Sequence, residues 1–268
     1  MGYIILDNHN SALLKFDLNS YQIEKFLDIP INKGLKGRYV NMDKVGDDGF
    51  LFENSQREIG YYQIKNKKTK ILYRNAKCPI YFDDNKSILF NKKEKTNDGF
   101  KGYMCLGGLD GEECMKLREI GLGDSAICPL KINKNEAIVV TSKNFNKSNF
   151  EIFNIKDFSF KPTFFEDCIP KFSLSDGGVL CKDNDKYFIS DKFGKRKKNV
   201  PLELVNSYDM LPQAYFKEIN SILIYEFRER VLRKNVYNLW LLNMDTLDKS
   251  LLIKGTGTTN KGAIYISN

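Results

Sequence analysis

The sequence predicts an all-β fold, a single six-bladed β-propeller of four-stranded antiparallel blades. The main observation is a repeated pattern: a proline, an apolar strand, a polar turn and a second apolar strand. Its four clearest copies are 78–82 with 87–90, 128–132 with 137–140, 169–172 with 178–181, and 211–216 with 221–225. Self-similarity at about 40 to 50 residues, built from strands, is typical of a propeller.

Two less regular copies complete the ring. One is 39–42 with 49–52, where Arg38 replaces the proline, and the other is split between the chain ends, at 262–266 and 3–6. We therefore expect the C-terminal strand to pair with the N-terminal strands and so remove the open sheet edge. The predicted single domain, 1–268, has blades at 262–268 plus 1–29, 38–74, 78–120, 128–165, 169–202 and 211–254.

Each apolar pair is followed by a second hairpin, which supplies the outer strands. In chain order these hairpins are 12–18 and 22–29, 58–64 and 70–74, 102–106 and 114–120, 150–155 and 162–165, 186–190 and 197–202, and 237–243 and 250–253. Leu14, Phe16 and Leu18 show the alternation of a half-buried strand. The inner strands are the most apolar and the outer ones the most charged, as stacked blades require. The alternatives are an antiparallel sandwich or two small β domains.

The formal net charge of +8 points to nucleic acid or an acidic protein as partner. Two lysine-rich clusters, 65–70 and 192–198, fall in outer hairpins of the second and fifth blades, on opposite sides of the ring. A surface that follows phosphates needs one continuous basic stripe with aromatic residues. Nucleic acid is therefore the less favoured partner.

The beginning of the chain has no basic segment followed by a long apolar core, as a signal peptide would. No apolar run reaches the length that spans a bilayer. We expect a cytoplasmic monomer without membrane contact. Its six cysteines are then expected to be buried free thiols. Cys105 and Cys114 are on two strands of one predicted hairpin and could be neighbours, and Cys78 and Cys128 occupy equivalent positions at the channel end of adjacent blades.

The chain has one histidine, His9, in an expected loop. This excludes most hydrolase triads and multi-histidine metal centres, so we predict no metal and no cofactor. No P-loop or dinucleotide-binding motif is present. Carboxylates are plentiful, so a carbohydrate-active or hydrolytic propeller with acidic residues at the channel mouth is an alternative.

The order of proline, strand, a turn such as Asp83-Asp84-Asn85-Lys86-Ser87 or Leu174-Ser175-Asp176-Gly177-Gly178, and strand resembles the six-bladed TolB-type propellers. A looser resemblance is to WD-repeat-like propellers, although Trp240 is not followed by aspartate. The resemblance covers the full chain. It implies the propeller fold and a role in binding proteins or peptides.

Three connections between second and third strands are predicted to be long loops, at 91–100, 143–149 and 227–236. Extra loop length costs conformational entropy and is often used for recognition. The predicted protein-binding residues combine apolar anchors with arginines: Phe145, Arg228, Arg230, Leu232 and Arg233. The predicted function is a non-catalytic protein-binding propeller, in a specific version an inhibitor or immunity protein that caps a partner such as a bacterial toxin. An RNA-binding propeller is the third hypothesis.

Overall fold

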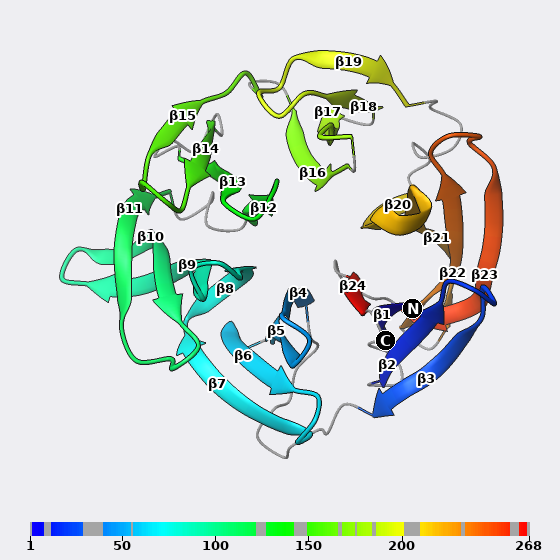
Figure 1. Ribbon diagram of the computed structural model, residues 1–268, viewed down its shortest axis with the longest axis horizontal. Helices are drawn as coiled ribbons and strands as arrows, with labels where there is room; N and C mark the ends of the chain where they lie inside the picture. Colours follow the sequence, from blue (N-terminus) through cyan, green and yellow to red (C-terminus); the bar gives the residue numbers. More distant parts are fainter. Residues whose placement is uncertain are drawn as a thin grey trace.

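The computed structural model describes residues 2–7, 12–28, 40–54, 56–121, 127–141, 149–165, 168–174, 176–183, 186–200, 210–231, 234–257 and 263–266. Within these ranges the strands pair into six four-stranded antiparallel sheets. Figure 1 shows the sheets arranged around a central axis, each with its first strand nearest the axis and its fourth strand at the outside. The predicted all-β propeller of four-stranded antiparallel blades is thus confirmed.

The sheets follow the chain in order. The first contains β24 (Ala263–Ile266), β1 (Gly2–Asp7), β2 (Ala12–Asp17) and β3 (Ile23–Asp28). The second contains β4 (Val40–Val45), β5 (Gly49–Glu53), β6 (Glu58–Gln63) and β7 (Lys68–Arg74). The third contains β8 (Ala76–Phe82), β9 (Ser87–Thr96), β10 (Gly99–Gly108) and β11 (Cys114–Ile120).

The other three sheets repeat this order. The fourth contains β12 (Leu130–Lys131), β13 (Glu136–Val140), β14 (Phe150–Asn154) and β15 (Phe160–Pro162). The fifth contains β16 (Ile169–Ser173), β17 (Val179–Asp183), β18 (Lys186–Ser190) and β19 (Arg196–Asn199). The sixth contains β20 (Met210–Phe216), the 3-10 turn η2 (Lys217–Ile219), β21 (Ser221–Val231), β22 (Lys234–Asn243) and β23 (Lys249–Gly257).

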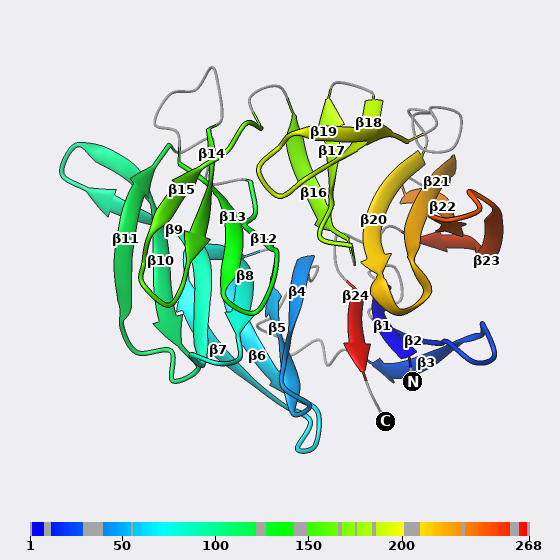
Figure 2. The same ribbon diagram turned by 45° about the horizontal axis from the view of Figure 1, so that its top comes forward.

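The two ends of the chain share one sheet. β24 pairs antiparallel with β1, with Ile266 opposite Gly2 and Ala263 opposite Ile5. The predicted pairing of the C-terminal strand with the N-terminal strands is confirmed, and Figure 2 shows β24 beside β1.

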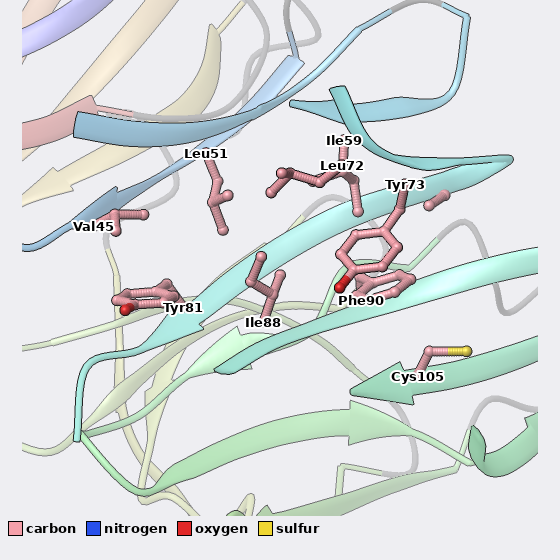
Figure 3. Packing of buried hydrophobic residues seen from close by; sticks show 10 residues of the cluster. Val45, Leu51, Ile59, Leu72, Tyr73, Tyr81, Ile88, Phe90 and Cys105 are labelled. Atoms are coloured by element: carbon pink, nitrogen blue, oxygen red, sulfur yellow. The ribbon is translucent and has the colours of Figure 1, made fainter. Parts of the chain in front are cut away.

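The core lies between neighbouring sheets. Between the second and third sheets, Leu51 and Tyr73 meet Ile88 and Phe90, all of them buried (Figure 3). The rings of Tyr73 and Phe90 stack with their centroids 4.5 Å apart. Replacing a buried aromatic of this kind by alanine costs about 3–5 kcal/mol. Every residue of β5 is buried and every residue of β19 is exposed, as expected for inner and outer strands.

The recurring proline has a structural reason. The first strands are bulged near their beginning: at Asn41 in β4, at Cys78 and Pro79 in β8, at Lys171 in β16, and at Gln213 in β20. Proline cannot donate a hydrogen bond, so sheets accept it at edge strands and bulges. The first strand of each blade is the edge strand that faces the axis, so a proline in this strand breaks no hydrogen bond to a further strand.

Two of the three predicted long loops are regular strands, which corrects the sequence prediction. β9 and β10 are paired along their whole length, from Ser87 opposite Gly108 to Thr96 opposite Gly99. β21 and β22 are paired as far as Val231 opposite Lys234. The sequence predicted loops because these strands extend beyond the packed core, where their residues are polar and charged and show no apolar alternation. The third segment, 143–149, lies outside the described residues apart from Asn149.

Removing residues 261–268 would delete β24 and leave β1 with an unpaired edge. We expect the melting temperature to fall by roughly 10 °C or more, since each kcal/mol corresponds to about 2–4 °C at this size. The measurement is thermal unfolding followed by circular dichroism. The control removes residues 267 and 268 alone, which keeps β24. A melting temperature within about one or two degrees of the full chain would contradict the closure.

Candidate functional site

A cavity of about 670 Å³ lies at the centre of the ring. Residues of β4, β8, β16 and β20, together with β12 and the residues just before it, line this cavity. This volume is within the range of small-ligand and peptide pockets. The inner strands converge here because each sheet places its first strand nearest the axis (Figure 1).

The cavity wall is mainly apolar and its charged side chains are mostly basic. Pro79, Ile80, Pro129 and Phe172 supply apolar surface. The basic lining residues are Lys131, Lys171 and Lys217, and of the lining residues that the structure describes Asp43 alone is acidic. The site therefore suits an apolar segment with negative charge better than a cationic one.

Asp43 is held in place by its neighbours. Its carboxylate accepts hydrogen bonds from the backbone N–H of Tyr81 at 2.6 Å and of Lys44 at 3.0 Å. Burial raises the pKa of Asp43, and the charge of Lys131 opposes that rise. Lys131 itself donates to the carbonyl of Tyr81 and lies 3.7 Å from Asp83. Asp43 and Lys131 thus link the inner strands of three consecutive sheets.

Glu53, at the end of β5, is the second buried carboxylate near the cavity, with 7% of its surface exposed. Its Oε2 accepts hydrogen bonds from the Cys78 backbone N–H at 2.8 Å and from Asn41 Nδ2 at 2.6 Å. Burial raises its pKa, while these hydrogen bonds and the charges of Lys77 and Arg57 lower it. Glu53 therefore fastens the two bulged strands β4 and β8 to each other.

A disulfide joins Cys78 to Cys128, with their Cα atoms 4.9 Å apart. Cys78 is in β8 and Cys128 is two residues before β12, so the bond links the inner strands of the third and fourth sheets. The expectation that these two cysteines are free thiols is wrong. Their equivalent positions in successive repeats, near the axis, bring the two side chains together.

The other four cysteines, Cys105, Cys114, Cys168 and Cys181, are thiols. Among the described residues, no group of three or more His, Cys, Asp or Glu side chains is arranged to hold a metal ion. His9 lies outside those residues. No helix in the described part of the chain is long and apolar enough to cross a membrane.

The predicted protein-binding residues are only partly placed. Arg228 is exposed on β21, with its guanidinium 3.9 Å from Glu226 Oε2. Glu226 is fixed in turn by Trp240 Nε1 and Asn238 Nδ2, each at 3.0 Å. Arg230 is also in β21, opposite Asn235 of β22. Phe145, Leu232 and Arg233 lie outside the described residues.

The hairpin that carries Arg228 and Arg230 projects from the ring. Met210, where β20 begins, is opposite Glu226, and β21 continues through 227–231. At roughly 3.3 Å per residue the hairpin extends about 16 Å beyond the inner strand. On the other side of the ring, β9 continues through 93–96 past the beginning of β8 and adds a second hairpin, visible in Figure 2. Both project on the face where the inner strands begin.

The projecting hairpin of β9 and β10 also has recognition chemistry. Phe100 is 52% exposed, and Lys93 Nζ lies 4.2 Å from the centre of its ring. Cation–π contacts of this kind hold an aromatic side chain at the surface in a defined position. The sequence analysis singled out this segment for its length and missed Phe100.

Sequence reasoning also missed Asp43, Glu53 and Lys131. Asp43 and Glu53 stand in or beside strands among ordinary charged residues, and no spacing marks them. Their role depends on contacts with β8 that are formed only when the sheets close around the axis. The only available signal was the break in an apolar pattern at the end of β5.

No known protein family matches this sequence, and no curated protein sequence matches it. Among solved structures, TolB from Acinetobacter baumannii is similar with a TM-score of 0.66 and 14% identity, over 98% of this chain and 65% of that one. The likeness is one of fold. This chain thus spans less than two thirds of that TolB chain.

Two further structures are similar in the same way. A putative TolB from Agrobacterium tumefaciens has a TM-score of 0.61 and 8% identity, over 97% of this chain and 92% of that one. YCF48 bound to D1 peptide has a TM-score of 0.53 and 13% identity, over 92% of this chain and 76% of that one. The TolB structures agree with the fold that the repeats predict.

The raised pKa of Glu53 predicts a pH dependence of stability. Above the ordinary value of 4.5 and up to the raised pKa, the folded chain binds this proton more tightly than the unfolded chain. The free energy of unfolding must therefore fall as the pH rises through this window. Relative to Glu53→Gln, the wild type should lose stability from pH 4.5 upward in urea unfolding. A difference in free energy of unfolding between the wild type and Glu53→Gln that does not change with pH would contradict this prediction. The control is Glu112→Gln, at an exposed glutamate.

Replacing Cys78 and Cys128 together by serine should lower the free energy of unfolding. The bond closes a loop with a sequence separation of 50. Chain entropy gives about 4 kcal/mol for a loop of that length, and measured disulfides typically contribute about 2–4 kcal/mol. Denaturant unfolding of the variant should match that of the wild type under dithiothreitol. Equal stability of oxidised wild type and variant would show that the bond does not constrain the ring.

Proposed function

We propose that this chain is a non-catalytic, protein-binding propeller: one six-bladed domain, 1–268, that acts as a monomer. The observation that carries the proposal is the pair of hairpins, β9–β10 and β21–β22, which project from the same face on opposite sides of the ring. Strand pairing beyond the core serves no packing between blades. It instead gives a partner two rigid arms, of which β9–β10 points outward past β11 in Figure 1.

The chemistry of this face favours an acidic partner. Arg228 on one arm and Lys93 beside Phe100 on the other combine cationic and aromatic surface. Arginine and aromatic residues are enriched where protein interfaces are tightest. The three lysines of the cavity extend the positive charge toward the axis. We propose that Phe145, Arg228, Arg230, Leu232 and Arg233 contribute to the contact: Phe145 from the connection between β13 and β14, and the other four from the β21–β22 hairpin.

The structural comparisons support a binding role by analogy of fold. YCF48, with a similar propeller, is solved with a bound peptide. In this chain an acidic, partly apolar segment of the partner would lie between the arms and enter the cavity. The more specific version of the proposal is an inhibitor or immunity protein that covers the active surface of a partner such as a toxin.

The disulfide near the axis bears on where the protein works. Such bonds persist in oxidising compartments and are rare in a reducing cytoplasm. The Cys78–Cys128 bond therefore supports an oxidising compartment over the cytoplasm expected from the sequence.

Reversing the charge of the β21 arm should remove partner binding. Arg228→Glu with Arg230→Glu places acidic groups against an acidic partner, and the exposed charge of Arg228 contributes little to folding. We expect the double variant to lose, in affinity capture and quantitative mass spectrometry, the protein that the wild type retains, with an unchanged melting temperature.

The matched control is Lys67→Glu with Lys68→Glu, at the end of the turn between β6 and β7 and at the first residue of β7, on the opposite face. This variant should retain the partner. If it loses the partner and the arginine variant does not, the binding face has been wrongly assigned. Basic charge should mainly speed association, so added salt should lower the association rate more than it raises the dissociation rate.

A further inference from the structure

Cys105 and Cys114 lie side by side on one face of the third sheet. In the pairing of β10 with β11, Cys114 is opposite Gly107 and Cys105 is opposite Lys116, so the two cysteines occupy diagonal positions. Diagonal positions on one face of a sheet are about 7–8 Å apart, with the Cβ atoms somewhat closer.

The two thiols differ in access. Cys105 is fully buried in the core between the second and third sheets, beside Tyr73 and Phe90. Cys114 is half-buried and packs against the edge of that core. A reagent from solution can therefore reach Cys114 and cannot reach Cys105.

The two thiols also differ in their charged neighbours. Lys92 Nζ donates toward Cys114 Sγ at 3.7 Å, so an ammonium group lies beside this sulfur. Glu94, 3.2 Å from Lys92, holds that lysine in place from the same strand. Burial first, and then the neighbouring Cys114, raises the pKa of the Cys105 thiol. Cys114 is thus arranged to react and Cys105 to stay protonated beside it.

We propose that Cys105 and Cys114 form a reversible redox site that exchanges with disulfides of small thiols, with Cys114 as the attacking and Cys105 as the resolving cysteine. The site borders the β9–β10 arm of the proposed protein-binding face, which carries Glu94. It also differs from the Cys78–Cys128 bond, since it connects two strands of one sheet and is a dithiol in this structure.

The exchange takes two steps. The Cys114 thiolate attacks one sulfur of glutathione disulfide; a Cys114–glutathione bond forms, the glutathione disulfide bond breaks, and one glutathione thiolate leaves and takes a proton from water. Cys105 then attacks Cys114 Sγ, and its proton passes to the second departing glutathione. Two protein thiols are oxidised to a disulfide, and one glutathione disulfide is reduced to two thiols.

Burial makes the second step the slower one. The attacking species is the thiolate, and the raised pKa of Cys105 keeps that form scarce. We therefore expect the mixed disulfide on Cys114 to accumulate before the internal bond forms.

The test is a time course of the full chain with glutathione disulfide at neutral pH, quenched in acid and read by intact mass and peptide mapping. One glutathione should appear on Cys114 and then be replaced by a Cys105–Cys114 bond, which dithiothreitol reverses. Cys105→Ala should stop at the mixed disulfide. Should that variant fail to fold, the wild-type order of products carries the same information.

Lys92→Gln tests the charged neighbour. Loss of the ammonium should slow the first step several-fold, because Lys92 Nζ lies 3.7 Å from the sulfur that attacks. Lys95→Gln, at an exposed lysine of the same strand, is the matched control and should react at the wild-type rate. First labelling at Cys168 or Cys181, no labelling, or an unchanged rate in Lys92→Gln would each overturn the proposal.

Discussion

The rest of the structure depends on the burial of each sheet's faces against neighbouring sheets. A four-stranded sheet with buried residues on both faces, such as that of Leu51 and Tyr73, needs a partner on each side. Only a closed ring gives every sheet two neighbours. The closure in turn brings the first strands of the sheets together at the axis, where residues of β4, β8, β12, β16 and β20 line the cavity and the disulfide joins β8 to the residues before β12.

The fold could be predicted because it is encoded locally and repeatedly. Apolar strand and turn recur in each blade, four times with a proline, and the divided repeat at 3–6 and 262–266 indicated the closure that Tyr3 and Tyr265 form. Segments 91–100 and 227–236 were misread because strands that project beyond a core lose their apolar alternation. The register of β21 with β22, carried by backbone hydrogen bonds, leaves little trace in residue type.

The site could be predicted much less well. Glu53 and Asp43 act through contacts with β8, and such contacts between sheets have no fixed spacing in the sequence. For the cysteines, the sequence indicated positions but not bonds. Cys105 and Cys114 could be expected as neighbours because one hairpin joins them, whereas for Cys78 and Cys128 the repeat indicated only equivalent positions in adjacent blades. Whether either pair is bonded depends on side-chain approach, which residue type does not determine.

The shared sheet of β1 and β24 has a consequence for synthesis. β24 is the last strand of the ring to leave the ribosome, and β1 is the first, so the edge of β1 waits unpaired while all the other strands are made. Pairings between distant parts of a chain form slowly, and unpaired edges attract other chains meanwhile. The nascent ring therefore has its greatest need of chaperone protection before its final residues emerge.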